Sequence, residues 1–223
     1  MLSIIATPIG NLKDITLRSL EVMRASDGII CEDTRRTKLL LDHYDIHKPL
    51  FTLNDFNEVK QFPVIIDNLH LGKNLVLVSD AGTPLVSDPG YKLIRETIAA
   101  GLEVDSLPGP TAPITALTMS GFPPDKFMFI GYLPEKPGQR EKMLLSLKTI
   151  HEIQQTTFIA FVAPHKLIKT VTELLPLYGD VDICLAKELT KVYQKVSTKK
   201  VSLWIEQFKK SPPKGEYVML FRP

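Results

Sequence analysis

The stretch "NLVLVSDAGTPLVSDPGYKLIRETIAA", Asn74 to Ala100, decides the fold class. A short apolar run is followed by a loop with two Ser-Asp pairs, two glycines and two prolines, and then by an amphipathic helical pattern. This order is typical of a buried strand that enters a helix through a ligand-binding loop. Because α/β sheets bind ligands at the carboxyl ends of their strands, Asp80 and Asp88 are placed where chemistry is expected.

The same alternation of strand-like and helical patterns continues along the chain. Four further apolar runs in the first half, each near a helical pattern, are "LSIIAT", "GIIC", "PLFTL" and "LEVDSLP". They predict a mostly parallel sheet covered on both faces. A turn-rich break, "GFPPDKF" at Gly121 to Phe127, precedes strands of more antiparallel character and a hairpin around Val192 to Val196. The sequence therefore predicts two α/β domains, residues 1–120 and 121–223.

Composition excludes several classes of protein. Of the 223 residues, 44% are hydrophobic and 23% charged, which is ordinary for a globular domain pair. Cys31 and Cys184 lie far apart in apolar runs and are expected to be buried thiols, not a disulfide or a metal site. No run approaches the ~18 apolar residues of a membrane span. We expect a cytoplasmic protein with no membrane contact and no metal.

Charge is divided unevenly between the two halves. Residues 1–120 hold 11 Lys and Arg against 15 Asp and Glu, whereas residues 121–223 hold 16 against 10. A basic half beside an acidic half is typical of a protein that faces a polyanion, although a solvated lysine-rich surface has the same composition.

Four loops at strand ends together predict a ligand cleft, because their glycines admit a ligand to the backbone and their prolines make them rigid. They are "ATPIGN", "CEDTRRT", "SDAGTPLVSDPG" and "PGPTA", starting at Ala6, Cys31, Ser79 and Pro108. None is a G-x-G-x-x-G or Walker loop, and no H-E-x-x-H, paired C-x-x-C or G-x-S-x-G is present. The usual dinucleotide, triphosphate, metal-hydrolase and serine-nucleophile motifs are therefore absent from the sequence.

Five blocks in this order carry a family resemblance. They are "ATPIGNLKDITLRSLE", "CEDTRRTKLLL", "LVSDAGTPLVSDPGYKLI", "PGPTAPITALTMSG" and "FMFIGYLP". Together they resemble the tetrapyrrole methylase superfamily of S-adenosylmethionine (SAM)-dependent methyltransferases. Within it they are similar to the bacterial subfamily that methylates the ribose 2′-hydroxyl of a decoding-centre cytidine in 16S ribosomal RNA. The resemblance implies two α/β domains with the cofactor in a cleft between them, a homodimer, and the small ribosomal subunit as partner.

The resemblance also implies which residues hold SAM, largely through backbone atoms. In the first domain they are Pro8, Gly10, Asp80, Ala81, Gly82, Thr83, Val86, Ser87, Thr111 and Ala112. In the second domain the residues expected to close over the adenine are Phe161, Val162, Ala186, Pro213, Lys214 and Gly215.

Two blocks depart from the family pattern. Where relatives commonly carry Glu-His-Asn-Glu, this chain has Asp55 and Phe56 before Asn57 and Glu58. Where they carry "YESPHR", this chain has "FVAPHK", which loses a glutamate and keeps His165. This second departure leaves open a non-catalytic module that binds SAM or RNA. A tetrapyrrole C-methyltransferase is the other alternative, although adjacent Arg35 and Arg36 suit phosphate better than an apolar substrate.

A ribose hydroxyl is a poor nucleophile and needs a base or neighbouring cations. The candidate bases are Glu32, Asp33 and Glu58. Asp33 is equally suited to cap a helix that starts at Thr34, and Glu58 to be a first-turn helix acid. The substrate-binding candidates are Arg35, Arg36, Asn57 and His165, each of which also has a surface or helix-end interpretation.

The opening loop divides into two parts. "SDAGTP" is interpreted as backbone wall for SAM, because small residues allow close approach. "SDPG" is interpreted as the helix entry, with Ser87 or Asp88 as the cap and Pro89 in the first turn.

Overall fold

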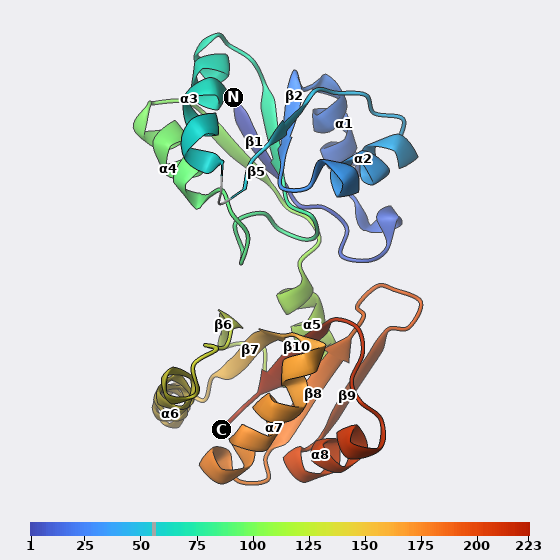
Figure 1. Ribbon diagram of the computed structural model, residues 1–223, viewed down its shortest axis with the longest axis vertical. Helices are drawn as coiled ribbons and strands as arrows, with labels where there is room; N and C mark the ends of the chain where they lie inside the picture. The colour runs from blue at the N-terminus through green and yellow to red at the C-terminus, as the bar shows by residue number, and fades with distance from the viewer. Residues whose placement is uncertain (55–56) are drawn as a thin grey trace. The chain divides into compact units, whose positions relative to one another are not determined.

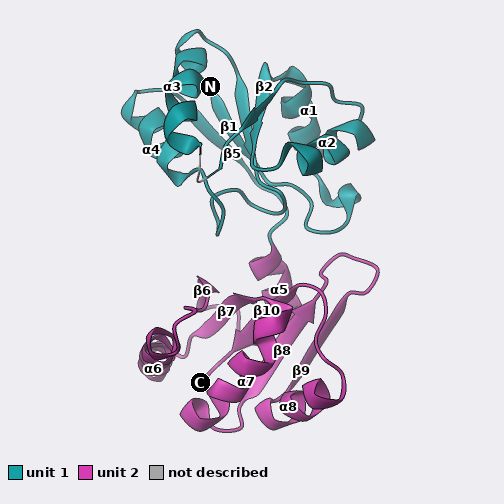
Figure 2. Cartoon of the chain, viewed as in Figure 1, with its two compact units in different colours: residues 1–111 teal, residues 112–223 magenta. Residues whose placement is uncertain are grey.

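The computed structural model describes residues 1–54 and 57–223 and divides them into two compact units, 1–111 and 112–223 (Figure 2). The sequence places the boundary after residue 120. The difference is helix α5 (Ala112–Ser120), which packs on strands of the second unit's sheet. Its buried residues include Ala116 and Leu117, and its apolar character on nearly every side suits a helix covered by its own sheet.

The first unit contains a five-stranded sheet in which every neighbouring pair is parallel. Its strands are β1 (Leu2–Ile5), β2 (Gly28–Cys31), β3 (Leu50–Thr52), β4 (Leu75–Val78) and β5 (Val104–Leu107), in the order β3-β2-β4-β1-β5. All residues of β1, β2 and β4 are buried, which explains their continuous apolar sequences. The predicted parallel sheet is confirmed.

The helices of this unit lie on opposite faces of the sheet because the chain reverses direction across it (Figure 1). Helices α1 (Leu17–Ala25) and α2 (Thr34–His43) share one apolar core, and α3 (Glu58–His70) and α4 (Tyr91–Ala99) share another. The connections through α1 and α2 run toward the β3 edge, and those through α3 and α4 run back toward β5. Right-handed crossovers in opposite directions put their helices on opposite faces.

The second unit has a mixed sheet with helices on both faces. Its strands are β6 (Phe127–Tyr132), β7 (Thr157–Val162), β8 (Asp182–Lys187), β9 (Lys195–Lys200) and β10 (Tyr217–Phe221), in the order β6-β7-β10-β8-β9. Only β6 and β7 are parallel; the other neighbours are antiparallel, and β8 and β9 form the predicted hairpin.

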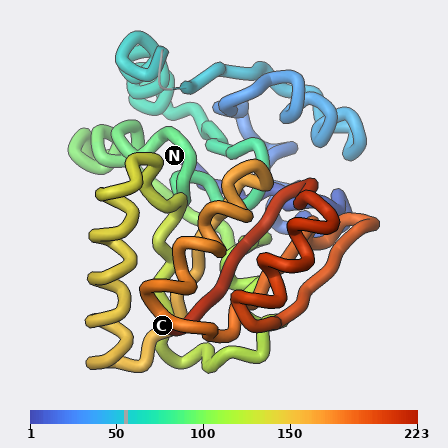
Figure 3. The backbone as a smooth tube through the Cα atoms, turned by 60° about the horizontal axis from the view of Figure 1, so that its bottom comes forward, coloured from blue at the N-terminus to red at the C-terminus, as the bar shows by residue number. Residues whose placement is uncertain are grey.

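Three helices of the second unit, α6 (Pro137–Gln154), α7 (Pro164–Tyr178) and α8 (Val201–Lys210), share one core with the sheet, and Figure 3 shows them running along it. The cysteines, Cys31 in the first unit and Cys184 in the second, are buried free thiols, as predicted.

A buried arginine joins three parts of the second unit. Arg140 on α6 donates to both carboxylate oxygens of Glu173 on α7, with its Nη2 atom 2.7 Å from Oε1. Its Nη1 atom donates to the carbonyl oxygens of Pro134 and Glu135, each at 2.8 Å. The pair therefore fixes the loop after β6 as well as the two helices, and the guanidinium lowers the pKa of Glu173.

We expect Arg140→Met to lower the free energy of unfolding by about 3 kcal/mol, because it leaves Glu173 and two carbonyls without their donor. In Glu173→Gln the loss should depend on pH. The folded pKa of Glu173 lies below its ordinary value of 4.5, so the pair stabilises fully above about pH 4.5 and less as pH falls through the lowered pKa. Urea unfolding between pH 3 and 7, with exposed Glu141→Gln as control, measures both effects; a difference that does not change with pH contradicts this role.

Candidate functional site

The loops after β1, β4 and β5 are tied together in the first unit. Thr7 and Gly82 exchange two backbone hydrogen bonds of 2.9 Å each. The Thr7 hydroxyl donates to the Ser79 carbonyl at 3.1 Å, and the Thr83 hydroxyl donates to the Pro110 carbonyl at 3.1 Å. Three of the four loops singled out in the sequence are thereby brought to one place.

Glycines at this place permit contacts that no other residue allows. Gly82 has a φ of +81°, and a Cβ added to it would lie 3.3 Å from the Ile9 side chain. A Cβ on Gly109 would lie 2.9 Å from the Cβ of Ala6, closer than such atoms come. The loops therefore form a cradle (Thr7–Gly10, Ser79–Thr83 and Pro108–Thr111) whose walls are largely backbone and small side chains.

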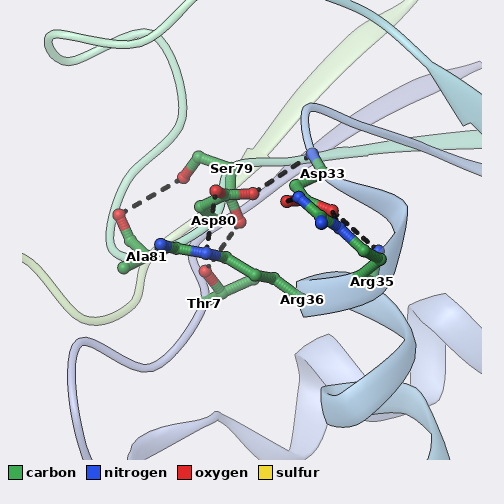
Figure 4. Close-up of polar contacts among 7 residues, drawn as sticks. All are labelled: Thr7, Asp33, Arg35, Arg36, Ser79, Asp80 and Ala81. Carbon is green, nitrogen blue, oxygen red and sulfur yellow. Dashed lines mark hydrogen bonds and ion pairs between the residues drawn. The ribbon is translucent and has the colours of Figure 1, made fainter.

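The fourth loop, which follows β2, is attached to the cradle through the Asp80 carboxylate, as Figure 4 shows. Asp80 Oδ1 accepts a hydrogen bond of 3.2 Å from the Asp33 backbone, and Asp80 Oδ2 lies 3.4 Å from Nε of Arg36. Both partners belong to the start of α2, which follows β2. Asp80, predicted only as part of the cofactor wall, thus also holds two strand-end loops together.

Asp33 caps α2, which was one of the two interpretations left open. Its Oδ1 accepts from the Arg35 backbone at 2.9 Å, and its Oδ2 lies 2.7 Å from Nη2 of the Arg35 side chain. These contacts lower the pKa of Asp33 to about 2. The two arginines at a helix N-terminus are therefore compensated by carboxylates, Arg35 by Asp33 and Arg36 by Asp80. Both arginine side chains remain mostly exposed.

Other predicted polar residues of this unit also have structural partners. Glu58 is buried at the start of α3 and forms an ion pair with Lys92 of α4. Asn57 donates to the Thr52 carbonyl at 3.0 Å. Glu32 is half-buried next to Asp33. Asp55 and Phe56, where the chain departs from the family pattern, lie outside the described residues.

The expected capping by Ser87 or Asp88 was wrong. Helix α4 begins at Tyr91, and its N-cap is Gly90, with a φ of +113° and no side-chain cap. The left-handed glycine turns the chain into the helix and leaves Pro89 outside it, where the sequence placed it in the first turn. Asp88 is half-buried in hydrogen-bond contact with Ser79, and burial followed by the charge of Asp80 raises its pKa. The structure thus adds a carboxyl group to the site that the sequence assigned to a helix end.

The residues of the second unit that the sequence predicts for SAM binding meet at one end of three adjacent strands, β7, β10 and β8. Register places Phe161 of β7 and Ala186 of β8 on either side of Val218, and Val162 and Lys187 on either side of Tyr217. The segment Pro213, Lys214, Gly215 lies just before β10 at this end of the strands. His165 is exposed in the first turn of α7.

A hollow of about 510 Å³ opens where β6 and β7 end. Its wall includes Tyr132, Phe161, Val162 and Lys166, and Lys166 forms an ion pair with Glu135. The sequence did not single out Tyr132. The signal that could have identified it is an aromatic residue at the end of a predicted strand.

No helix within residues 1–54 and 57–223 is long and apolar enough to cross a membrane. The same residues contain no group of three or more His, Cys, Asp or Glu side chains that could hold a metal ion.

Residues 1–203 match the family model described as Tetrapyrrole (Corrin/Porphyrin) Methylases. The chain is 43% identical to "Ribosomal RNA small subunit methyltransferase I" of Thermotoga maritima, over 98% of this chain and 96% of that protein. It is 42% identical to the protein of the same name from Escherichia coli O157:H7, over 98% of this chain and 76% of that protein.

Solved structures of much lower identity share the fold. A diphthine synthase aligns with a TM-score of 0.72 at 16% identity, over 99% of this chain and 89% of that chain. A cobalt precorrin-4 methyltransferase of cobalamin biosynthesis aligns with a TM-score of 0.71 at 16% identity, over 99% of this chain and 94% of that chain. These likenesses confirm the predicted fold class.

Proposed function

The chain belongs to the tetrapyrrole methylase family, and we propose that it is a SAM-dependent methyltransferase of small-subunit ribosomal RNA. The observation that carries this proposal is the identity of about 40% along nearly the whole chain to proteins named as such methyltransferases. The resemblance of the strand-end blocks extends the proposal to the ribose 2′-hydroxyl of a decoding-centre cytidine in 16S RNA, acting in the cytoplasm.

The site residues fit SAM. A cradle of backbone and small side chains, in which a Cβ at Gly82 would crowd Ile9, suits a cofactor bound through main-chain atoms. We propose that it is held by the cofactor residues named from the sequence in both units. Bound SAM supplies an already activated methyl group, so the task left to the protein is to position the hydroxyl and remove its proton.

The contacts of the candidate bases distinguish those that can accept a proton from those that are structural. The low pKa of Asp33 and its pairing with Arg35 make it a poor proton acceptor. Glu58 is buried and paired with Lys92. We propose that both are structural, and that the proton goes to Asp88, whose raised pKa makes it a stronger base than an ordinary aspartate. Glu32 is the remaining candidate.

Exposed cations suit an RNA substrate better than a tetrapyrrole. Arg35 and Arg36 project from the loop next to the cradle, and the second half of the chain is basic. We propose further that the chain acts as a homodimer, as the resemblance implies. The exposed apolar side chains of edge strand β6, Phe127 and Met128, support an interface there.

Methyl transfer from radiolabelled SAM tests the substrate class. We expect label in small ribosomal subunits that lack the modification, less in naked 16S RNA, and none in uroporphyrinogen. The labelled nucleotide should survive alkaline hydrolysis as a dinucleotide, because a methylated 2′-oxygen cannot attack the neighbouring phosphate. Absence of label in every RNA, or label in uroporphyrinogen, would sink the proposal.

Substitution of each carboxyl group tests the base. We expect Asp88→Asn to lower kcat by about 100-fold and to abolish the rise of rate with pH. That rise should lie above the ordinary aspartate pKa of 3.8, because the base must be ionised and its pKa is raised. Asp33→Asn, which keeps a capping oxygen, should change kcat little. If Glu32→Gln instead removes the pH dependence, Glu32 is the base.

Calorimetry with SAM tests the cradle. Asp80→Ala removes the acceptor of the Asp33 amide and the partner of Arg36, so we expect affinity to fall roughly 10- to 100-fold. Gly82→Trp should abolish binding. The control is Asp105→Ala, which breaks an exposed ion pair between Asp105 of β5 and Arg18 of α1. Unchanged affinity in both site variants contradicts the placement of the cofactor.

A further inference from the structure

The loop of the β8–β9 hairpin, Glu188 to Gln194, is held rigidly although it projects beyond the sheet (Figure 1). Its first part is anchored by the buried side chain of Leu189. Glu188 Oε1 accepts a hydrogen bond of 2.8 Å from the Glu216 backbone, and Lys191 Nζ lies 2.7 Å from Oε2 of Glu216. The loop is therefore tied to the residue that precedes β10.

Glycine at position 215 makes this tie possible. A Cβ there would lie 2.8 Å from Glu188 Oε1, which is too close for any other residue without movement. Gly215 and Ala186, the last but one residue of β8, both belong to the residues proposed for SAM. The base of the hairpin loop is thus next to residues of the second unit that are proposed for SAM.

The tip of this loop is a tight turn with unusual residues. The Gln194 amide donates to the Lys191 carbonyl at 3.0 Å, so Val192 and Tyr193 occupy the two corner positions of a β-turn. Turn corners usually hold Gly, Pro, Asn, Asp or Ser. Here Val192 is 93% exposed and Tyr193 is 78% exposed. A turn that only connects two strands does not require exposed side chains of these types.

The charge around the tip suits a polyanion. The segment 187–200 contains five lysines and one glutamate; Lys191 pairs with Glu188 and Glu216, and Lys200 pairs with Asp182. Lys195, the first residue of β9, is exposed, and β9 is an edge strand, so its outer side is open to a partner. An aromatic side chain among lysines is how proteins bind single-stranded RNA, because the ring stacks on a base while the cations contact phosphates.

We propose that the tip of the β8–β9 hairpin binds the RNA substrate, with Tyr193 stacking on an unpaired base and Lys195 contacting a phosphate. The inference rests on the proposed function and adds a substrate-contacting element to it. Because the loop is tied to Glu216 and packed through Leu189, the ring of Tyr193 is held at a fixed place on the second unit. Tyr193 is thus a substrate-binding residue that takes no part in proton transfer.

The test compares Tyr193→Ala with Tyr193→Phe in the full-length protein. We expect Tyr193→Ala to raise KM for small subunits about 5- to 100-fold, the usual effect of losing one base–aromatic stack, with kcat and SAM affinity unchanged. Tyr193→Phe keeps the ring and should stay within about twofold of wild type. Tyr91→Ala, which removes an exposed tyrosine of α4, is the control for loss of a surface ring. Lys195→Gln should reduce the salt dependence of RNA binding by about one unit of slope.

Filter binding of small-subunit RNA by the same variants separates this inference from the proposed function. If the wild type binds RNA without methylating it, the function fails, and weaker binding by Tyr193→Ala still supports the tip. If Tyr193→Ala matches the wild type in both KM and RNA affinity, the tip does not contact RNA. A change in oligomeric state by light scattering in Tyr193→Ala would assign the tip to contact with a second copy and overturn the proposal.

Discussion

The arrangement of the first unit's site depends on one carboxylate. Asp80 follows β4 and accepts the backbone amide of Asp33, which follows β2, while Arg36 pairs with its second oxygen. Strands β2 and β4 are neighbours in the sheet, but the hydrogen bonds of the sheet do not extend to the loops that follow them. The Asp80 contacts fix these loops. Because Asp80 binds the backbone amide of Asp33, the Asp33 side chain remains available to cap α2. A carboxylate that the sequence assigns to the cofactor wall thus also positions two loops.

The cradle that includes Asp80 depends on residues that have small side chains or none. Gly109 brings the loop after β5 closer to the loop after β1 than a side chain would allow, and Gly82 adopts a positive φ that side chains disfavour. Hydrogen bonds from Thr7 and Thr83 hold the loops there. The same principle recurs in the second unit, where Gly215 admits the carboxylate of Glu188. In both units small residues leave the backbone accessible and hydrogen bonds to side chains hold it in place, so a ligand bound there would meet preorganised main-chain groups.

The sequence predicts those parts of the structure whose physics is local. Continuous apolar runs gave β1, β2 and β4, because a strand buried on both faces needs them. The cap at Asp33 was among the predictions because it depends on neighbours in sequence. The entry to α4 was mispredicted, since Gly90 adopts a left-handed conformation that competes with capping by Ser87 or Asp88. The Arg140–Glu173 pair and the Asp80–Arg36 contact join residues distant in sequence, and no periodicity reveals such pairs.

The diphthine synthase and the precorrin methyltransferase share this fold at 16% identity. In this chain, a cradle of main-chain groups requires small residues at a few positions and few particular side chains. Substrate recognition has the opposite requirement, since distinguishing an RNA from a corrin depends on side-chain charge and shape. In this chain the side chains that we propose for substrate recognition are Arg35 and Arg36 at the start of α2 and Tyr193 at the tip of the β8–β9 hairpin. Arg35 and Tyr193 are mostly exposed, so substitutions at these positions disturb the packing of the fold least.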